Sequence, residues 1–196
     1  MIISPMPTHK NLPLISFVDK VTFEQWLRKN HAQITGIWVR FYKKNSNVES
    51  VSYPEAVDVA LCWGWIDGLI NKYNEISYLI RFTPRGKKSI WSQINVTKVE
   101  RLTIEGRMQP SGLAHVEAAK IDGRWANAYP GQGNMKIPPD FLHQIEKPQY
   151  TEAKQVFAML KRSELYSIAF ALYPLEGDKR VKKIGQIIQK LLSKHP

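Results

Sequence analysis

The spacing of apolar and polar residues changes along the chain, and each change predicts a different element. Residues 19–31 begin with a capping Asp19 or Thr22 and repeat apolar side chains at helical spacing, which predicts a helix. The side chains expected to face the core are Phe23, Trp26 and Leu27. Residues 35–44 instead alternate apolar and polar positions and are rich in strand-forming residues, so they predict a strand.

A second helix is predicted after the polar loop that follows this strand. Ser52 is the expected cap, Pro54 lies in the first turn, and acidic residues favour the same end. We expect the helix to run toward Gly64 and Gly68, which either end it or allow a close backbone approach. Residues 70–84 then predict a hairpin of two strands.

From residue 91 onward the pattern is mostly helical, and it closes with an amphipathic helix over residues 179–194. The expected fold class is α+β: a small antiparallel sheet with N-terminal helices and a largely helical C-terminal half. We expect a flexible N-terminal arm over residues 1–18, an α+β core over 19–135, and a helical region over 136–196 packed on the core.

The composition is that of an ordinary globular protein. The chain has 196 residues, of which 43% are hydrophobic and 23% charged, enough to bury a core without crosslinks. Cys62 is the single cysteine, so no internal disulfide forms and a cytoplasmic location is expected. No apolar run approaches the ~20 residues of a membrane span. No metal-ligand cluster or cofactor motif occurs, so neither a metal nor a cofactor is expected.

The net charge of +11 is concentrated in two segments. Residues 71–136 hold 11 basic against 5 acidic residues, and residues 175–196 hold 6 against 2. Such a field attracts anions, including phosphates, nucleic acid, acidic lipid head groups and acidic proteins. The alternative is a solubilising surface with no acidic partner.

The first candidate site is the stretch CWGWIDG, where Trp63 and Trp65 precede Asp67. One interpretation is a pocket wall that stacks a planar group, with Asp67 accepting hydrogen bonds or pairing with Arg81 or Arg85. The alternative is that the tryptophans belong to the core and Asp67 holds a turn or a structural ion pair. An aspartate in so apolar a stretch is costly to bury without a partner.

The second candidate is RFTPRGKKSIWSQIN, residues 81–95, which predicts an anion-binding corner. Cationic side chains and serine hydroxyls precede a helix that starts near Trp91, and helix N-termini carry partial positive charge. The alternative is a solvated basic loop with an ordinary helix cap. The full predicted ligand-binding set is Trp65, Asp67, Arg81, Arg85, Lys87, Lys88, Ser89, Trp91, Ser92 and Asn95.

Candidates for catalysis are few. The five histidines lie outside both stretches, and neither Ser89 nor Ser92 has an evident base. Cys62 is surrounded by apolar residues and is expected to be buried and inert. Asp67 is therefore the best candidate for a catalytic acid or base.

Longer motifs carry a family resemblance. The run Y-x-E-A-V-x-x-A-L-C-x-G-W-I-D-G starts at Tyr53, and R-F-T-P-R-x-x-x-S-x-W-S-x-x-N starts at Arg81. In this order and spacing the chain resembles the bacterial YdeI/OmpD-associated family, also called bacteriocin-protection proteins. The chain departs from the family at Gly86, where a second arginine is common. It also departs near Lys179 and Lys183, where lysines replace part of an arginine pattern.

The resemblance implies a fold of the YjbR/CyaY-like α+β group and a link to protection against bacteriocins and cationic antimicrobial peptides. It brings no accepted reaction and no cofactor. Our first hypothesis is a protein that binds a small anionic or planar ligand. The alternatives are nucleic-acid binding through the basic middle and tail, and an enzyme acting on a phosphorylated small molecule. The oligomeric state stays open.

Overall fold

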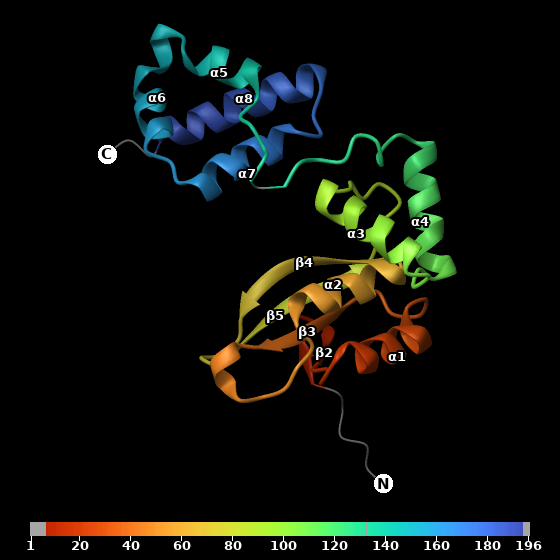
Figure 1. Ribbon diagram of the computed structural model, residues 1–196. Coiled ribbons are helices and arrows are strands. Elements are labelled where there is room, and N and C mark those ends of the chain that lie inside the picture. Colours follow the sequence, from red (N-terminus) through yellow and green to blue (C-terminus); the bar gives the residue numbers. More distant parts are fainter. Residues whose placement is uncertain (1–6, 132, 194–196) are drawn as a thin grey trace. The chain divides into compact units, whose positions relative to one another are not determined.

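The computed structural model describes residues 7–131 and 133–193, and its contacts divide the chain into two compact units. The first unit comprises Met1–Ala128 and the second Tyr129–Pro196. The division falls after Ala128, somewhat before the boundary expected at residue 135. Figure 1 shows both units.

A mixed sheet forms the base of the first unit, with strand order β1-β2-β3-β5-β4 among the described residues. The strands are β1 (Thr8–His9), β2 (Leu12–Ile15), β3 (Ile37–Tyr42), β4 (Trp65–Lys72) and β5 (Ser77–Pro84). The pairs β1–β2, β3–β5 and β4–β5 are antiparallel, whereas β2 runs parallel to β3. A parallel pair needs a crossover, and the helix between β2 and β3 supplies it. The α+β class is confirmed, with a mixed sheet in place of a purely antiparallel one.

The described part of the expected N-terminal arm is a hairpin of the sheet. Lys10 and Asn11 connect β1 to β2 with φ of 47° and 63°, and a two-residue hairpin turn with two positive φ angles has this form. Leu14 packs against Trp38 and Leu79 in a small buried cluster. The expectation of a flexible arm is therefore wrong for residues 7–18, while residues 1–6 lie outside the described residues. A short apolar run that includes a proline has no clear period, so its pattern did not predict a strand.

Helices cover one face of the sheet. α1 (Lys20–Asn30) begins at the Asp19–Thr22 capping box, in which the Thr22 amide donates to Asp19 Oδ1 over 2.8 Å. α2 (Tyr53–Cys62) has Ser52 as its N-cap, and the Ser52 amide and hydroxyl both donate to the Glu55 carboxylate. Both helices and the facing side of β3 and β5 form the main core, whose members include Phe23, Leu27, Ile37, Val39, Phe41, Ala56, Ala60, Ile80 and Phe82.

The end of α2 differs from the prediction. The helix stops at Cys62, and Gly64 has a φ of +75°, a left-handed conformation that suits glycine. The chain therefore reverses there, and Trp65 begins β4 rather than ending a helix. The apolar run after Cys62 suits a strand and a helix equally, which is why its pattern did not locate the change.

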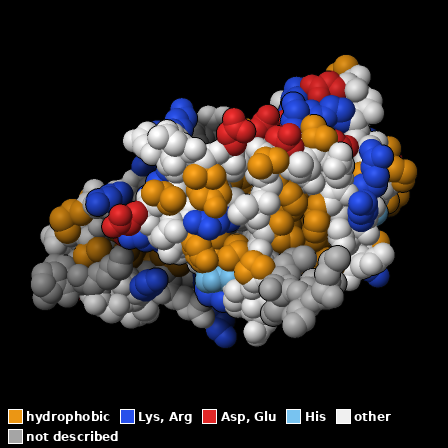
Figure 2. All heavy atoms as spheres, turned by 90° about the horizontal axis from the view of Figure 1, so that it is seen from below, with side chains coloured by type: hydrophobic (Ala, Val, Ile, Leu, Met, Phe, Trp, Pro, Cys, Tyr) orange, Lys and Arg blue, Asp and Glu red, His pale blue; other side chains and the backbone are white. Residues whose placement is uncertain are grey.

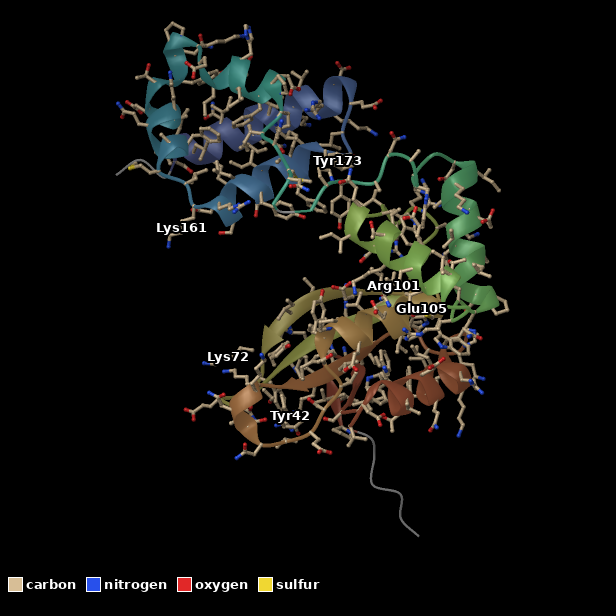
Figure 3. The ribbon with its side chains drawn as sticks, in the orientation of Figure 1. Tyr42, Lys72, Arg101, Glu105, Lys161 and Tyr173 are labelled. Carbon is tan, nitrogen blue, oxygen red and sulfur yellow. The ribbon has the colours of Figure 1, made fainter. Side chains whose placement is uncertain are left out.

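Two further helices complete the first unit, α3 (Gln93–Ile104) and α4 (Pro110–Ile121). Asp58 on α2 forms ion pairs with Lys98 and Arg101, which attach α3 to α2. Partial burial acts to raise the pKa of Asp58, but the two cationic partners together outweigh it and lower the pKa. Arg101 also pairs with Glu105 at 2.7 Å, and Figure 3 shows these two side chains close together.

α4 is held against the end of α2 by a glycine contact. A Cβ built on Gly112 would lie 2.2 Å from the Cys62 carbonyl oxygen. The same carbonyl accepts the Gln109 amide at 3.0 Å, and Ser111 Oγ donates to the Trp63 carbonyl oxygen at 3.0 Å. The two backbones therefore touch directly, with no room for a side chain between them.

The second unit is helical and has a core of its own. It contains α5 (Pro139–Ile145), α6 (Thr151–Ala158), α7 (Arg162–Leu172) and α8 (Gly177–Leu192). A short 3-10 helix, Pro148–Tyr150, precedes α6, and another, Lys44–Ser46, follows β3 in the first unit. The buried residues that form this core are Phe141, Ile145, Ala153, Val156, Leu172, Ile184, Ile188 and Leu191. Arg180 makes a two-pronged pair with Asp140 and also donates to the Leu172 carbonyl oxygen at 2.6 Å. No helix in the described ranges is both long and apolar enough to cross a membrane.

Candidate functional site

The two tryptophan-bearing stretches meet in the structure. Trp65 pairs with Pro84 at the start of the β4–β5 hairpin, and the Arg85 amide donates to the Gly64 carbonyl oxygen over 2.9 Å. The hairpin thus brings together the two stretches that contain the predicted ligand-binding residues.

The large side chains at this meeting point form packed interior rather than the wall of a pocket. Trp65 is 1% exposed, and its Nε1 donates to the His31 carbonyl oxygen at 3.2 Å. Trp91 is 2% exposed and Arg85 5%, with the guanidinium carbon 3.6 Å from the centre of the Trp91 ring. These three side chains therefore have no surface to offer a ligand.

The predicted anion corner is a capped turn. Ser92 Oγ accepts the Asn95 amide at 3.1 Å and so caps α3, while Ser89 Oγ accepts the Gly86 amide at 3.1 Å. Ser92 is buried, and both hydroxyls bond within their own segment. Lys87 and Lys88 are exposed on the loop.

Arg81 lies apart from this cluster. Its cross-strand partner is Trp38, and residues paired across a sheet share one face. Neighbouring Phe82 lies on the helix-covered face with the main core. Because side chains alternate along a strand, Arg81 faces the opposite side of the sheet from Trp65.

Cys62 and His115 border the packed cluster, and burial affects both. Burial raises the pKa of the Cys62 thiol to about 11, which confirms the expected buried cysteine and keeps it protonated at neutral pH. Burial and, secondly, the charges of Arg85 and Arg124 lower the pKa of His115 below its usual 6.5. Neutral His115 therefore fits the folded state better than the charged form.

We expect acidification to destabilise the protein through His115. A lowered pKa means that the unfolded chain binds this proton more readily, so stability is lost as the pH falls below about 6.5. In urea unfolding at pH 7.5 and 5.5, His115→Gln should lose less stability between the two pH values than the parent protein. His143→Gln, which replaces an exposed histidine on α5, is the matched control and should behave as the parent. Equal losses in all three proteins would contradict the prediction.

Asp67 has a hydrogen-bond partner that the sequence did not identify. Its Oδ2 accepts the Tyr53 hydroxyl at 2.7 Å, instead of pairing with Arg81 or Arg85. Tyr53 is the first residue of α2 and is 38% exposed. The best predicted catalytic candidate therefore lies beside a tyrosine, not beside an arginine.

Tyr53 in turn lines a hollow of about 650 Å³ in the first unit, which we call the tyrosine hollow. It lies where the ends of β3 and β5 meet the loop leading into α2. Its lining residues are Phe41, Tyr42, Lys43, Lys44, Asn47, Val48, Glu49, Ser50, Val51, Ser52, Tyr53, Pro54 and Tyr78. Figure 3 shows Tyr42 at this end of the sheet.

Aromatic rings form the inner wall of the tyrosine hollow. Phe41 stacks on Tyr78 with ring centres 5.5 Å apart, and Tyr53 meets Phe41 edge-on at 6.3 Å. Phe41 is buried, so it supports the rings of Tyr53 and Tyr78 from behind. Burial raises the pKa of Tyr78, which keeps its hydroxyl protonated and able to donate a hydrogen bond.

The outer wall is the basic loop after β3. Lys43 Nζ donates to the Glu75 carbonyl oxygen at 2.7 Å, and Lys44 is exposed with no ion pair in the part of the chain that the structure describes. Two lysines against Glu49 leave this lining with one excess positive charge. The Val51 amide donates to the Phe17 carbonyl oxygen at 2.9 Å, which fastens the loop to the core.

The sequence pattern gives no direct sign of the tyrosine hollow. It predicts a strand over residues 35–44, a polar loop after it and a helix capped by Ser52, and it places Tyr78 in the second strand of the predicted hairpin. The available signal was local: an aromatic pair followed by two lysines, and then serines leading into a helix that begins with tyrosine. Only the folded sheet adds Tyr78, which pairs with Phe41 across β3 and β5.

Fold and hollow together define a class: an α+β module built on a mixed sheet, with an aromatic hollow edged by lysines. Residues 15–115 match the model of the family described as Domain of unknown function (DUF8412), and the chain belongs to this family. The matched residues include the tyrosine hollow and both tryptophan-bearing stretches. No curated protein and no solved structure matches the chain.

Proposed function

We propose that the protein binds a small ligand with a planar group and a negative charge, and that the tyrosine hollow is the binding site. The observation that carries this proposal is the combination, in one hollow, of partly exposed tyrosine rings with a lysine that has no ion pair among the described residues. Its volume of about 650 Å³ falls within the range of small-molecule sites. The ligand class is the one expected from the sequence, but the proposed site is the tyrosine hollow and not the two tryptophan-bearing stretches.

In this proposal each wall has a separate role. The rings of Tyr53 and Tyr78 stack on the planar part of the ligand, and the Tyr78 hydroxyl donates to one of its oxygens. Lys44 pairs with the negative charge at the open side. Asp67 accepts a hydrogen bond from the Tyr53 hydroxyl. If the bound molecule is a substrate, this carboxylate would accept a proton through Tyr53.

Calorimetric titration with nucleoside monophosphates, the corresponding nucleosides and inorganic phosphate tests the site. We expect the monophosphates to bind more tightly than either part alone, because ring and charge contact different walls. Lys44→Glu should weaken monophosphate binding about tenfold, since it removes a charge-assisted hydrogen bond and adds a repulsive charge. Nucleoside binding should change little.

Lys88→Glu is the matched control, because it makes the same charge change on an exposed residue outside the hollow. It should leave monophosphate binding within about twofold of the parent, the change that screening allows for a distant charge. Equal weakening by both variants would show binding to the general positive field and not to the hollow. If none of the probes bound, the proposal would be contradicted.

We further propose a cytoplasmic role in protection against bacteriocins or cationic peptides, supported by the resemblance of the motifs at Tyr53 and Arg81 to the YdeI/OmpD-associated family. The net charge of +11 argues against direct capture of a cationic peptide, because like charges repel. Binding of an anionic small molecule is an indirect route compatible with that charge.

Nucleic-acid binding is a weaker proposal. On the face drawn in Figure 2, lysine and arginine side chains are scattered among apolar and neutral ones rather than gathered in one stripe. Tracking of a phosphate backbone favours a continuous basic surface.

A further inference from the structure

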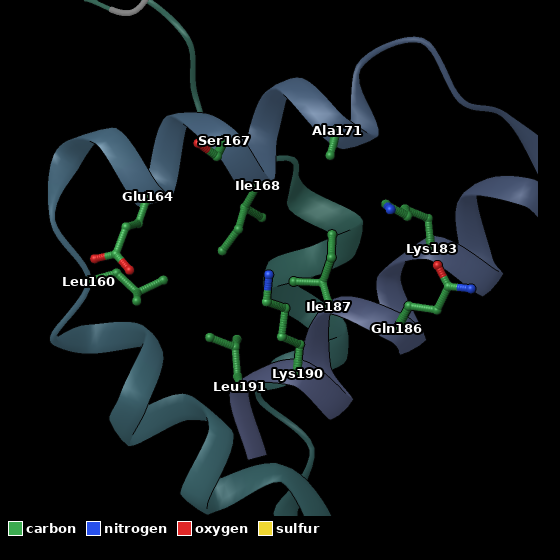
Figure 4. A pocket seen from close by; sticks show the side chains of 10 residues that line it. All are labelled: Leu160, Glu164, Ser167, Ile168, Ala171, Lys183, Gln186, Ile187, Lys190 and Leu191. Atoms are coloured by element: carbon green, nitrogen blue, oxygen red, sulfur yellow. The ribbon is translucent and has the colours of Figure 1, made fainter. Parts of the chain in front are cut away.

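The second unit contains a groove that the proposed function does not use. It lies between α7 and α8 and encloses about 440 Å³. Apolar side chains of Ile168 on α7 and of Ile187 and Leu191 on α8 line it, together with Leu160 from the segment before α7, as Figure 4 shows. Leu191 belongs to the buried core of this unit, and the other three are half-buried beside it. The groove is therefore an opening onto the core of the helical unit.

Two lysines on α8 edge this apolar surface. Lys183 and Lys190 are seven residues apart, which places them two turns apart on the same side of a helix. Neither lysine has an ion-pair partner within residues 7–131 and 133–193. Both positive charges are thus available to a ligand in the groove.

The acidic side chain of the groove lies at its other end. Glu164 is near Leu160 in Figure 4, and it accepts the Lys161 amide at 3.1 Å, where it caps α7. Lys183 lies toward Ala171 in the same view. The groove therefore has an apolar floor, a positive side along α8, and one negative charge at the Leu160 end.

We propose that this groove binds a single-chain aliphatic carboxylate, with the carboxylate near Lys183 and the alkyl chain on the apolar floor toward Leu191, where Lys190 adds a second positive charge. A volume of about 440 Å³ suits a small ligand and not a docked helix. Residues 183–191 span about 12 Å of helix axis. At roughly 1.2 Å per bond in an extended chain, that length accepts about ten carbons.

Calorimetric titration of the full chain with hexanoate, octanoate and decanoate, all below micelle-forming concentrations, tests the proposal. Affinity should rise about two- to fourfold for each added methylene that enters the groove. Decyltrimethylammonium, which has the same chain with a positive head, should bind at least tenfold more weakly than decanoate because the lysines repel it.

The variant Lys183→Glu/Lys190→Glu should weaken decanoate binding at least tenfold and improve binding of the cationic probe. The double variant Lys179→Glu/Lys182→Glu makes the same charge change on exposed positions of α8 that do not line the groove, and should bind decanoate as the parent does. Circular dichroism should show both variants folded, since the replaced side chains are not part of the core.

Equal weakening in the two double variants, no dependence on chain length, or equal binding of both amphiphiles would each overturn the proposal in favour of adsorption to a positive surface. None of these probes carries a ring, so their outcome is independent of binding in the tyrosine hollow. The two sites can therefore fail or succeed separately.

Discussion

Gly112→Ala is expected to lower the free energy of unfolding of the first unit by about 2–3 kcal/mol, through overpacking. The new methyl group would lie 2.2 Å from the Cys62 carbonyl oxygen and 2.9 Å from that of Leu61. Both are backbone atoms, so α4 must move away from α2 to admit it. Helix propensity alone predicts the opposite sign, a gain of about 1 kcal/mol for alanine over glycine.

Gly185→Ala on α8 provides the matched control. Apart from its chain neighbours and the backbone of its own helix, no atom of the described residues lies within 4 Å of a Cβ built there, so only helix propensity acts and stability should rise by about 0.5–1 kcal/mol. Urea unfolding followed by circular dichroism measures both variants. A Gly112→Ala protein as stable as the parent would show that α4 does not depend on the backbone contact at Cys62.

Trp91→Ala is expected to cost about 3–5 kcal/mol of unfolding free energy, the range for truncating a large buried aromatic side chain. Trp91 is 2% exposed, contacts Trp125 at 4.9 Å between ring centres, and supports the guanidinium of Arg85. Its loss leaves a cavity and removes the ring on which a buried charge lies. The effect should be largest in the urea midpoint of the first unit.

Lys88→Ala, three residues earlier on the exposed loop, should stay within about 0.5 kcal/mol of the parent. This comparison separates two interpretations of the same stretch. If Trp91→Ala kept the parent's stability and instead lost a ligand, the tryptophan would be a binding wall, as the sequence suggested. Loss of stability at Trp91 alone supports the packed interior.

Local chemistry made much of the fold predictable. Asp19, Ser52 and Ser92 each begin a helix with a side chain that caps the first turn, and these signals depend on only a few neighbouring residues. The residues after Cys62 were less informative, because tryptophan, isoleucine and glycine are compatible with either element. Pairing with β5, which lies later in the chain, decides the strand.

Of the candidate site, the sequence could predict only that the two tryptophan-bearing stretches approach each other. The hairpin predicted over residues 70–84 brings the two stretches toward each other, but its first strand begins at Trp65, five residues before the predicted start, and this extension places Trp65 beside Arg85. Whether the meeting point is open depends on α4, which contributes Ser111 and His115 from further along the chain. The tyrosine hollow depends likewise on Phe41 and Tyr78, which only the sheet register brings together.

The division after Ala128 also has a spectroscopic consequence. All six tryptophans fall between Trp26 and Trp125, whereas residues 129–196 contain tyrosine and phenylalanine but no tryptophan. Tryptophan emission, excited near the red edge of the absorption band, therefore reports unfolding of the first unit and does not report loss of structure in the second. Comparing its transition with the helical ellipticity signal would report whether the two halves of the chain melt as one cooperative block.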